Sequence, residues 1–546
     1  MHFKIKTING CKYLYLIKNK RVNGKIKQVM QMCIGSPKKV YQLVTSTGKL
    51  KVASFSFGKA AALLHAARNV GFLDAVDRHT DRRQQDGLTV SQYLFLLIAG
   101  RSEGALSRRQ IADWFSGSNL RFLWFPVHSL SSQNCLNYMS RLSDDAIKSI
   151  ERDVAERLIS LGYSPTRLIF DTTNQFTYIE KCENLPGKGK SKQKRYDKNI
   201  VGLALAVNDL NLPFLSSAYP GNKHDSDIFV EIFTAIVSRL EDLKVDCEEI
   251  TLIFDRGVNS EINVEMVVDK MHIVGAITRS QAKDFFTMPL DDFKFLYKNL
   301  KKHVIKGCRF DDVELFGRTF TVVVSYNEGT YKRQKKTYER RKKRILEGVK
   351  ELRKKASRKG KGRKLTLKGA TNRLVDMIPK QLRGVFDYSV SKDKNSGLLD
   401  IKCDIISDAE EDLYRSFGKN AIFTDNNVWT SEEIVRAYNS KSEIEDDFKW
   451  LHDKVLIPLQ PFWVRKDISL RAHVFLCVMG LLLYRYLLLE LSFERLSLPR
   501  FAAILEGIRL AIVKEEEKKA CIVVEEMTAE QARIFSALQL DRFVPK

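Results

Sequence analysis

Cysteine is scattered through this chain and forms none of the patterns that bind zinc or build a disulfide framework. The nine cysteines are an odd number, and no CxxC pair or Cys/His cluster occurs among them. This spacing argues against a zinc site and against a disulfide-stabilised fold. We therefore expect a protein of a reducing compartment, which favours the cytoplasm.

Long apolar runs are scarce as well. Residues 1–20 lack the apolar core of a signal peptide. The best candidate for a membrane helix, His473–Leu491, is long enough to cross a bilayer, but it contains Arg485 and Glu490 and follows several charged residues. We therefore expect a buried core helix at this position and no association with membranes.

Acidic residues are clearly outnumbered by basic ones. The chain has 66 Asp and Glu against 91 Lys and Arg, which gives a net charge of +25. A soluble protein this basic usually binds a polyanion, and nucleic acid is the default partner. Hydrophobic residues make up 44% of the 546 residues, so the chain can bury a sizeable core and is expected to form two to four domains.

The excess of basic charge is concentrated in one stretch. Tyr331–Lys364 contains 18 Lys or Arg and three Glu. Residues 338–356 within it show helical spacing, and Lys359–Lys364 has the composition of a flexible loop. The stretch is either a solvated helical hairpin or a segment that binds nucleic acid. Positive charges at this density repel one another unless phosphates lie nearby, which favours binding to nucleic acid. The candidate contacts are Lys335, Lys336, Arg340, Arg341, Lys342, Lys343 and Arg344.

In the N-terminal third, the spacing of apolar residues changes near residue 60 from a strand pattern to a helix pattern. Residues 1–60 alternate like short strands, with hairpin signals at Asn9-Gly10 and Asn23-Gly24. Residues 58–160 show apolar spacing typical of helices. Within them, residues 107–142 fit either a helix-turn-helix reader or ordinary bundle helices.

Residues 166–280 predict an alternating α/β segment. The order of elements is β-β-β-α-β-α-β, a meander of three strands followed by alternating helices and strands. The expected strands cover 167–173, 199–208, 212–221, 249–257 and 272–280, and the expected helices cover 225–243 and 262–271.

Two of these apolar strands end in the same motif. Leu-Ile-Phe-Asp171 and Leu-Ile-Phe-Asp255 each deliver one carboxylate at the end of a hydrophobic run. Each Asp taken alone could be a turn or cap residue. Two such acids on neighbouring strands, with a third from a helix, would supply hard oxygen ligands for two Mg²⁺ or Mn²⁺ ions.

A helix near residue 445 is the natural source of the third acid. At about 100° per residue, Tyr438, Lys441, Glu445, Lys449 and His452 share one helical face. The neighbouring acids of the same stretch point away from that face. The alternative is a surface helix of mixed charge, but with Asp residues ending two upstream strands the joint pattern favours catalysis.

Asp171, Asp255 and Glu445 resemble the DDE triad of insertion-sequence transposases. The helix resembles the signature of the superfamily named after insertion sequence four, which reads Tyr, two residues, Arg, three residues, Glu, six residues, Lys. Tyr438 and Glu445 match, Lys441 replaces the Arg, and His452 occupies the place of the Lys. Lys449 lies on the same face and could substitute. The long interval between Asp255 and Glu445 resembles the branch named after insertion sequence 1634.

This resemblance implies a fold and a reaction. The fold is α/β, with a ribonuclease-H-like catalytic core (a mixed five-stranded sheet with helices) interrupted by a β-rich insertion that carries the basic helix, and with a mainly helical N-terminal region. The reaction is metal-dependent DNA cleavage and strand transfer at terminal inverted repeats, by a prokaryotic, nucleoid-associated homodimer that holds two transposon ends and a target DNA. Tyr438, Lys441 and either Lys449 or His452 would contact phosphates. Trp429 would be a stacking platform for a flipped base or, alternatively, a buried core residue.

Two alternative functions stay open: a catalytically inactive DNA-binding protein derived from a transposase, and a ribonuclease-H-like nuclease that cuts without joining.

The resemblance also suggests domain boundaries. The expected segments are a β-rich N-terminal segment (1–60), a helical DNA-end-binding domain (61–160), the first segment of the catalytic core (161–280), an insertion domain (281–430) with the basic helix (331–364), the second segment of the catalytic core (431–495) and a helical tail (496–546).

Overall fold

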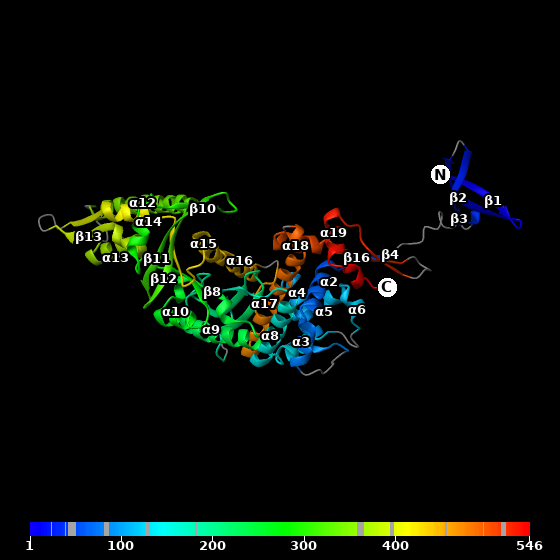
Figure 1. Ribbon diagram of the computed structural model, residues 1–546, viewed down its shortest axis with the longest axis horizontal. Helices are drawn as coiled ribbons and strands as arrows, with labels where there is room; N and C mark the ends of the chain where they lie inside the picture. Colours follow the sequence, from blue (N-terminus) through cyan, green and yellow to red (C-terminus); the bar gives the residue numbers. More distant parts are fainter. Residues whose placement is uncertain are drawn as a thin grey trace. The chain divides into compact units, whose positions relative to one another are not determined.

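The computed structural model divides the chain into two compact units (Figure 1). Unit 1 comprises residues 1–61, 116–123 and 503–546, and unit 2 comprises residues 62–115 and 124–502. The structure describes all residues except 23–24, 39, 42–50, 81–86, 126–129, 181–182, 358–364, 394–397, 454–455, 495, 515–519 and 546.

Unit 1 begins with an antiparallel sheet of β1 (His2–Ile8), β2 (Cys11–Val22) and β3 (Lys25–Gly35). The turn between β1 and β2 is Asn9-Gly10, and both residues have positive φ, 48° and 78°. Asn and Gly tolerate this left-handed conformation, so the expected hairpin is confirmed. The second expected turn, Asn23-Gly24, lies outside the described residues.

The C-terminal residues of unit 1 are not the purely helical tail that we expected. β16 (Arg509–Lys514) lies between β17 (Cys521–Val524) and β4 (Lys51–Ser56) in an antiparallel sheet, and α19 (Ala529–Ala537) follows. The short apolar run of β16 is a strand because its partner β4 comes from the other end of the sequence. Local periodicity carries no information about such a distant partner.

The helices expected before residue 160 are present. In unit 2, α3 (Phe72–His79) and α7 (Ser132–Met139) pack against α4 (Val90–Ser102). This helix is buried along nearly its whole length and begins with a capping box in which Thr89 accepts from the backbone N–H of Gln92. Tyr93 of α4 stacks on Tyr138 with 4.5 Å between ring centroids. The helices before residue 160 are α2 (Gly58–Asn69), α3 (Phe72–His79), α4 (Val90–Ser102), α5 (Arg108–Ser116), α6 (Leu120–Leu123), α7 (Ser132–Met139) and α8 (Asp144–Ser160).

The β-β-β-α-β-α-β segment follows in the expected order. Its five strands are neighbours in the sequence β9-β8-β5-β6-β7, in which the β5–β8 and β8–β9 pairs are parallel and the meander is antiparallel. The elements are β5 (Arg167–Thr177), β6 (Asn199–Asn208), β7 (Pro213–Pro220), α9 (Asp225–Asp242), β8 (Thr251–Ile253), α10 (Glu261–Val268) and β9 (His272–Ile277).

The sheet does not stop at five strands but has nine. β15 (Lys419–Thr424) pairs antiparallel with β9, and β12 (Arg318–Asn327), β11 (Val304–Leu315) and β10 (Lys294–Lys298) continue the same sheet outward. Pairing satisfies the backbone groups that an exposed edge of β9 would leave open. Of the strands that we expected in the β-rich insertion, those within residues 304–327 therefore extend the central sheet, whereas those within residues 386–405 form a two-stranded sheet of their own.

The basic stretch forms one long helix, α12 (Glu328–Ala356). One side of it is apolar and packs on a small core of its own, whereas Lys359–Lys364 lies outside the described residues. Tyr338, Ile345, Val349 and Leu352 are the buried residues of α12 in this core. The elements around them are α13 (Leu367–Met377), β13 (Phe386–Lys392), β14 (Leu399–Ile405) and α14 (Ser407–Ser416).

The apolar run near the C-terminus is α17 (Asp467–Glu490). By length and composition it could cross a membrane, but 83% of its most apolar window is buried inside the protein. Its charged residues are paired within unit 2, Arg485 with Asp447 at 2.6 Å and Glu490 with His65 at 2.9 Å. These contacts are typical of the core helix that we expected. A shorter helix, α18 (Leu498–Glu506), follows.

Arg485→Met is expected to destabilise the protein by about 3–5 kcal/mol, because Asp447 is fully buried and would lose its cation. Burial raises the pKa of Asp447 to about 7, and losing Arg485 would raise it further. Because the pKa of Asp447 is higher in the folded state than in the unfolded state, the folded state is favoured when Asp447 is protonated. The loss of stability caused by Arg485→Met should therefore be greater at pH 8 than at pH 5. Thermal unfolding across this range tests it, and Asp447→Leu/Arg485→Met should recover most of the stability.

Candidate active site

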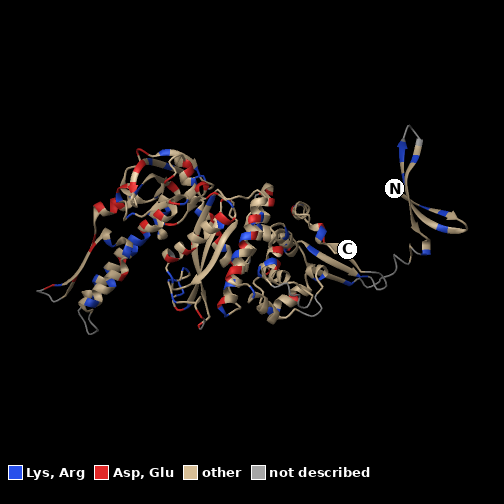
Figure 2. Ribbon diagram, turned by 60° about the horizontal axis from the view of Figure 1, so that its bottom comes forward, with Lys and Arg blue, Asp and Glu red and all other residues tan. Residues whose placement is uncertain are grey.

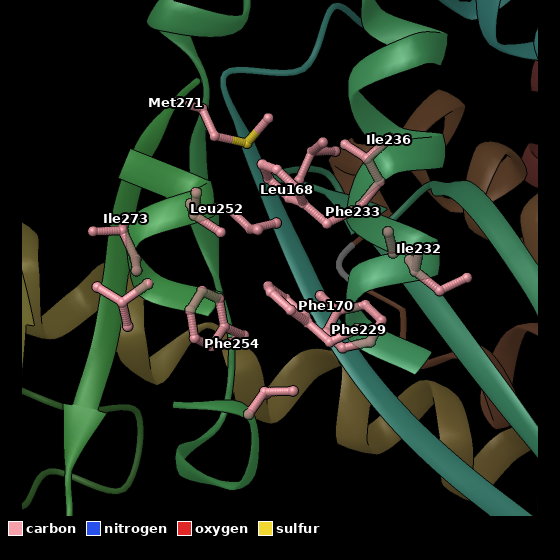
Figure 3. Close-up of a cluster of buried hydrophobic side chains, with 14 of the residues drawn as sticks. Leu168, Phe170, Phe229, Ile232, Phe233, Ile236, Leu252, Phe254, Met271 and Ile273 are labelled. Atoms are coloured by element: carbon pink, nitrogen blue, oxygen red, sulfur yellow. The ribbon is translucent and has the colours of Figure 1, made fainter. Parts of the chain in front are cut away.

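The two Leu-Ile-Phe-Asp motifs lie side by side in register. In the parallel pair of β5 and β8, Leu168 pairs with Leu252 and Ile169 with Ile253. The next residue of each motif is a buried phenylalanine, and both rings contact Phe229 of α9, as Figure 3 shows. The apolar residues thus fix both chains against the core. Asp255 follows the end of β8 as expected, whereas β5 continues to Thr177, so Asp171 lies within its strand and the prediction that it ends the strand is wrong.

Asp171 and Asp255 are held in similar ways. Asp171 accepts a hydrogen bond from the backbone N–H of Thr172 at 2.7 Å, and Asp255 accepts one from that of Arg256 at 2.8 Å. Burial raises the pKa of Asp171, and the negative charge of Asp255 adds to this effect, whereas Lys192 and Lys441 oppose it. The two carboxylates are therefore close enough to influence each other's protonation.

Asp255 is contacted by two residues of the predicted signature. The ammonium Nζ of Lys441 lies 2.8 Å from Oδ1 of Asp255, and the hydroxyl of Tyr438 donates to the same oxygen at 3.4 Å. Burial acts to raise the pKa of Asp255, but Lys441 more than offsets it, so the pKa is lowered. The pKa of Lys441 is raised, because its neighbours Tyr438 and Asp255 outweigh the effect of burial. Asp255 and Lys441 are thus a charged pair at neutral pH.

The signature helix is interrupted, which differs from the single helix that we expected. Tyr438 lies on α15 (Ser431–Asn439) and Lys441 begins α16 (Lys441–His452), with Ser440 between them. The Ser440 hydroxyl donates to the carbonyl of Ala437, a side-chain bond of the kind that bends helices. Both side chains nevertheless reach Asp255.

Glu445 is not drawn into this pair. It is exposed on α16, four residues and about 6 Å of helix beyond Lys441. Within the described part of the chain, no group of three or more His, Cys, Asp or Glu side chains could hold a metal ion, and Glu445 has no hydrogen-bond or ion-pair partner. The other acids of α16 are engaged: Glu443 accepts from Asn211, Asp446 pairs with Lys449, and Asp447 pairs with Arg485.

The two candidates for the last signature position differ in their surroundings. Lys449 is exposed and lies 2.6 Å from Asp446. His452 is half-buried, and burial together with the charge of Lys192 lowers its pKa. Its Nε2 is buried and has no hydrogen-bond partner among the described residues. The charge of Lys192 acts on the pKa of both Asp171 and His452, whereas Lys449 is engaged with Asp446.

The candidate DNA contacts of α12 divide into two groups. Lys342 faces inward, where it lies 2.7 Å from Glu410 and shares that carboxylate with the Tyr338 hydroxyl. It is therefore engaged within the fold. The other six are exposed along the helix, whose ribbon is coloured largely as Lys and Arg in Figure 2: Lys335, Lys336, Arg340, Arg341, Lys343 and Arg344.

Trp429 lies in the connection between β15 and α15. Its side chain is partly exposed, so the alternative of a fully buried core tryptophan is wrong. Its backbone carbonyl accepts from Nη1 of Arg309 at 2.6 Å, which ties this connection to β11.

Lys192 is the site residue that sequence reasoning missed. It lies in the loop between β5 and β6, and its ammonium donates to the carbonyl of Thr172, next to Asp171. Neither its distance in sequence from Asp171 and Asp255 nor its place outside the predicted strands indicates that it lies near these acids. The only signal is the cluster of lysines around it between Lys188 and Lys198.

Comparison with known protein families agrees with this geometry. Residues 176–483, more than half of the chain, match the family model described as the transposase DDE domain. The matched segment begins within β5, after Asp171, and includes Asp255 and Glu445. No curated protein matches the chain. The chain therefore belongs to the DDE transposase family, whose members are nucleic-acid-cleaving enzymes that act on DNA.

Proposed function

We propose that this protein cleaves and joins DNA strands at the terminal inverted repeats of a prokaryotic insertion sequence. The observation that carries the proposal is the parallel pairing of β5 and β8, which brings Asp171 and Asp255 close together beside Lys441. Tyr438 and Lys441 support the assignment to the insertion-sequence-four-like superfamily. The long interval between Asp255 and Glu445 supports the branch named after insertion sequence 1634.

In this proposal Asp171, Asp255 and Glu445 hold two Mg²⁺ or Mn²⁺ ions, the kind of divalent metal that this family typically uses. The donor chemistry fits, because carboxylate oxygens are hard ligands, but the described residues do not bring the three carboxylates into one group, so the proposal requires Glu445 to approach the two aspartates. When bound, the ions activate water or a 3′-hydroxyl and stabilise the leaving oxygen. Lys441 keeps Asp255 ionised, and an ionised carboxylate is the form that binds a cation.

The five neighbouring strands β9-β8-β5-β6-β7 support a ribonuclease-H-like core. The chain between β9 and α15 would be the insertion, anchored to the core through β15. In this proposal the core continues through α15 and α16, which carry the remaining signature residues.

The proposed substrate is double-stranded DNA, both transposon ends and target. Tyr438, Lys441 and His452 would contact phosphates near the carboxylates, and the partly exposed Trp429 is available to stack on a flipped base. Because two ends must be held at once, we propose a homodimer in the synaptic complex.

The exposed basic residues of α12 predict a salt-dependent contribution to DNA binding. Replacing Arg340, Arg341, Lys343 and Arg344 with Gln should reduce the slope of log K against log salt by up to about 3–4, because each lost phosphate contact removes about 0.9. Fluorescence anisotropy at several salt concentrations measures this. Lys342→Gln is the control, since its loss of the Glu410 contact should lower thermal stability and leave the slope nearly unchanged.

The test of the proposed function uses DNA that carries the inverted repeats flanking the gene. With Mg²⁺, the full-length protein should nick or cut at the repeat ends and join the freed 3′-ends to a target plasmid. Binding without nicking under Mg²⁺ or Mn²⁺ would favour an inactive DNA-binding protein. Nicking without joining would favour a ribonuclease-H-like nuclease.

A further inference from the structure

The loop between β5 and β6 is strongly basic and lies beside Asp171. We define the basic loop as residues 187–198. Asp197 is the only acid in this stretch of the sequence. The basic residues are Lys188, Lys190, Lys192, Lys194, Arg195 and Lys198.

Specific contacts hold the basic loop against β5. The backbone N–H of Lys192 donates to Oδ1 of Asn174 at 2.9 Å, and Nδ2 of Asn174 donates to the carbonyl of Lys190 at 3.1 Å. The N–H of Phe176 donates to Oε1 of Gln193 at 3.2 Å. Alternate residues of β5 therefore bind the middle of the loop, which fixes its position relative to the strand that carries Asp171.

The start of the basic loop is fixed as tightly. Gly187 and Ile200 exchange two backbone hydrogen bonds, of 2.8 and 3.1 Å. A Cβ at Gly189 would lie 2.0 Å from the carbonyl oxygen of Gly221, so only glycine fits this close approach. Ser191 is buried. The lysines of the loop are thus presented by a built scaffold.

This scaffold directs one lysine to the catalytic edge. The Lys192 ammonium donates to the carbonyl of Thr172, and its charge acts on both Asp171 and His452. Lys441 has the corresponding place beside Asp255. Asp171 and Asp255 therefore each have a lysine nearby, and the two lysines come from different regions of the chain.

The neighbours of Lys192 face solvent. Lys190 and Lys194, two residues away on either side, are exposed, as is Tyr196 with 67% of its surface accessible. Arg195 is engaged with Asp197 at 2.9 Å. The loop thus presents the exposed side chains of Lys190 and Lys194 on either side of Lys192, whose ammonium is bound to the carbonyl of Thr172.

We propose that the basic loop binds the phosphate backbone of the DNA strand that enters the active site, with Lys192 on the phosphate nearest Asp171 and with Lys190 and Lys194 on flanking phosphates. The inference rests on the proposed function for the identity of the strand. The binding itself is sequence-independent, because ammonium groups recognise phosphate charge and carry no base readout.

The experiment compares the full-length wild type with Lys192→Ala, Lys192→Arg and Lys190→Ala/Lys194→Ala, without metal, on repeat-end DNA and on an unrelated duplex. Lys192→Ala should reduce the salt slope by about 1, and the double variant by about 2, on both DNAs. Lys192→Arg, which keeps the charge, should retain the wild-type slope. Lys223→Ala, which removes an exposed lysine paired with Glu231 outside the loop, is the matched control and should change nothing.

Cleavage with Mg²⁺ then separates this inference from the proposed function. If wild type cleaves, Lys192→Ala should lower the single-turnover rate at least about tenfold, as expected of a lost contact worth about 1.4 kcal/mol in the transition state. Unchanged slopes in Lys192→Ala and in the double variant would overturn the inference even if wild type cleaves. Reduced slopes with no cleavage by wild type would support the loop as a DNA contact and count against the proposed function. Because Lys190 and Lys194 are exposed, the double variant keeps the test decisive if Lys192→Ala misfolds.

Discussion

Asp255→Asn and Asp171→Asn are each expected to reduce strand cleavage by on the order of 10³-fold or more, equivalent to about 4 kcal/mol of transition-state stabilisation. Asparagine keeps the shape of the side chain and can still accept from the following backbone N–H, as both aspartates do now. It removes the negative charge that a divalent cation requires. Single-turnover cleavage of repeat-end DNA with Mg²⁺ measures the loss.

The same variants should bind DNA at least as tightly as wild type. A removed carboxylate lessens repulsion of phosphate, and in Asp255→Asn it also releases the Lys441 ammonium from its ion pair. Asp269→Asn, on an exposed acid that lies near Arg318, is the matched control and should cleave normally. Cleavage at the wild-type rate by both site variants, with thermal unfolding unchanged, would show that the reacting phosphate lies elsewhere.

The elements around these two acids could be predicted because their sequence patterns are local. The apolar run Leu168–Phe170 lies in β5 and Leu252–Ile253 in β8, and α9 begins and ends within a residue of its predicted bounds. The shared motif even contains the register, since Leu168 pairs with Leu252. Buried parallel strands favour this kind of uninterrupted hydrophobic sequence.

What could not be predicted depends on partners distant in the chain. The sequence of β15 does not indicate that this strand pairs with β9, or that β12, β11 and β10 continue the sheet beyond it. β16 becomes a strand only through β4. Lys192 lies beside Asp171, on the carbonyl of Thr172, because Asn174 and Gln193 hold its loop against β5, and such side-chain bonds produce no periodic pattern in the sequence. In each case the missing information is tertiary.

The helical wheel was informative about α16 in a different way. The wheel places Glu445 on a different face of the helix from its acidic neighbours, and in the structure Glu445 also differs from them in having no bonding partner within the described part of the chain. Glu443, Asp446 and Asp447 each have a partner, whereas the Glu445 carboxylate has neither a hydrogen bond nor an ion pair among the described residues. An acid without a partner in the described structure, among three acids that have one, is available for an ion that the other three cannot bind without losing a contact.

Glu445→Gln is therefore expected to abolish cleavage as completely as the aspartate variants, on the order of 10³-fold, with folding and DNA affinity preserved. Glu443→Gln and Asp446→Asn, on the same helix, are matched controls whose effects should stay within about twofold, the range of ordinary surface substitutions. The measurement is single-turnover cleavage with Mg²⁺, together with DNA binding without metal. If Glu443→Gln or Asp446→Asn abolished cleavage and Glu445→Gln did not, the third ligand would be that other acid, and α16 would have to turn on binding DNA and metal to present it.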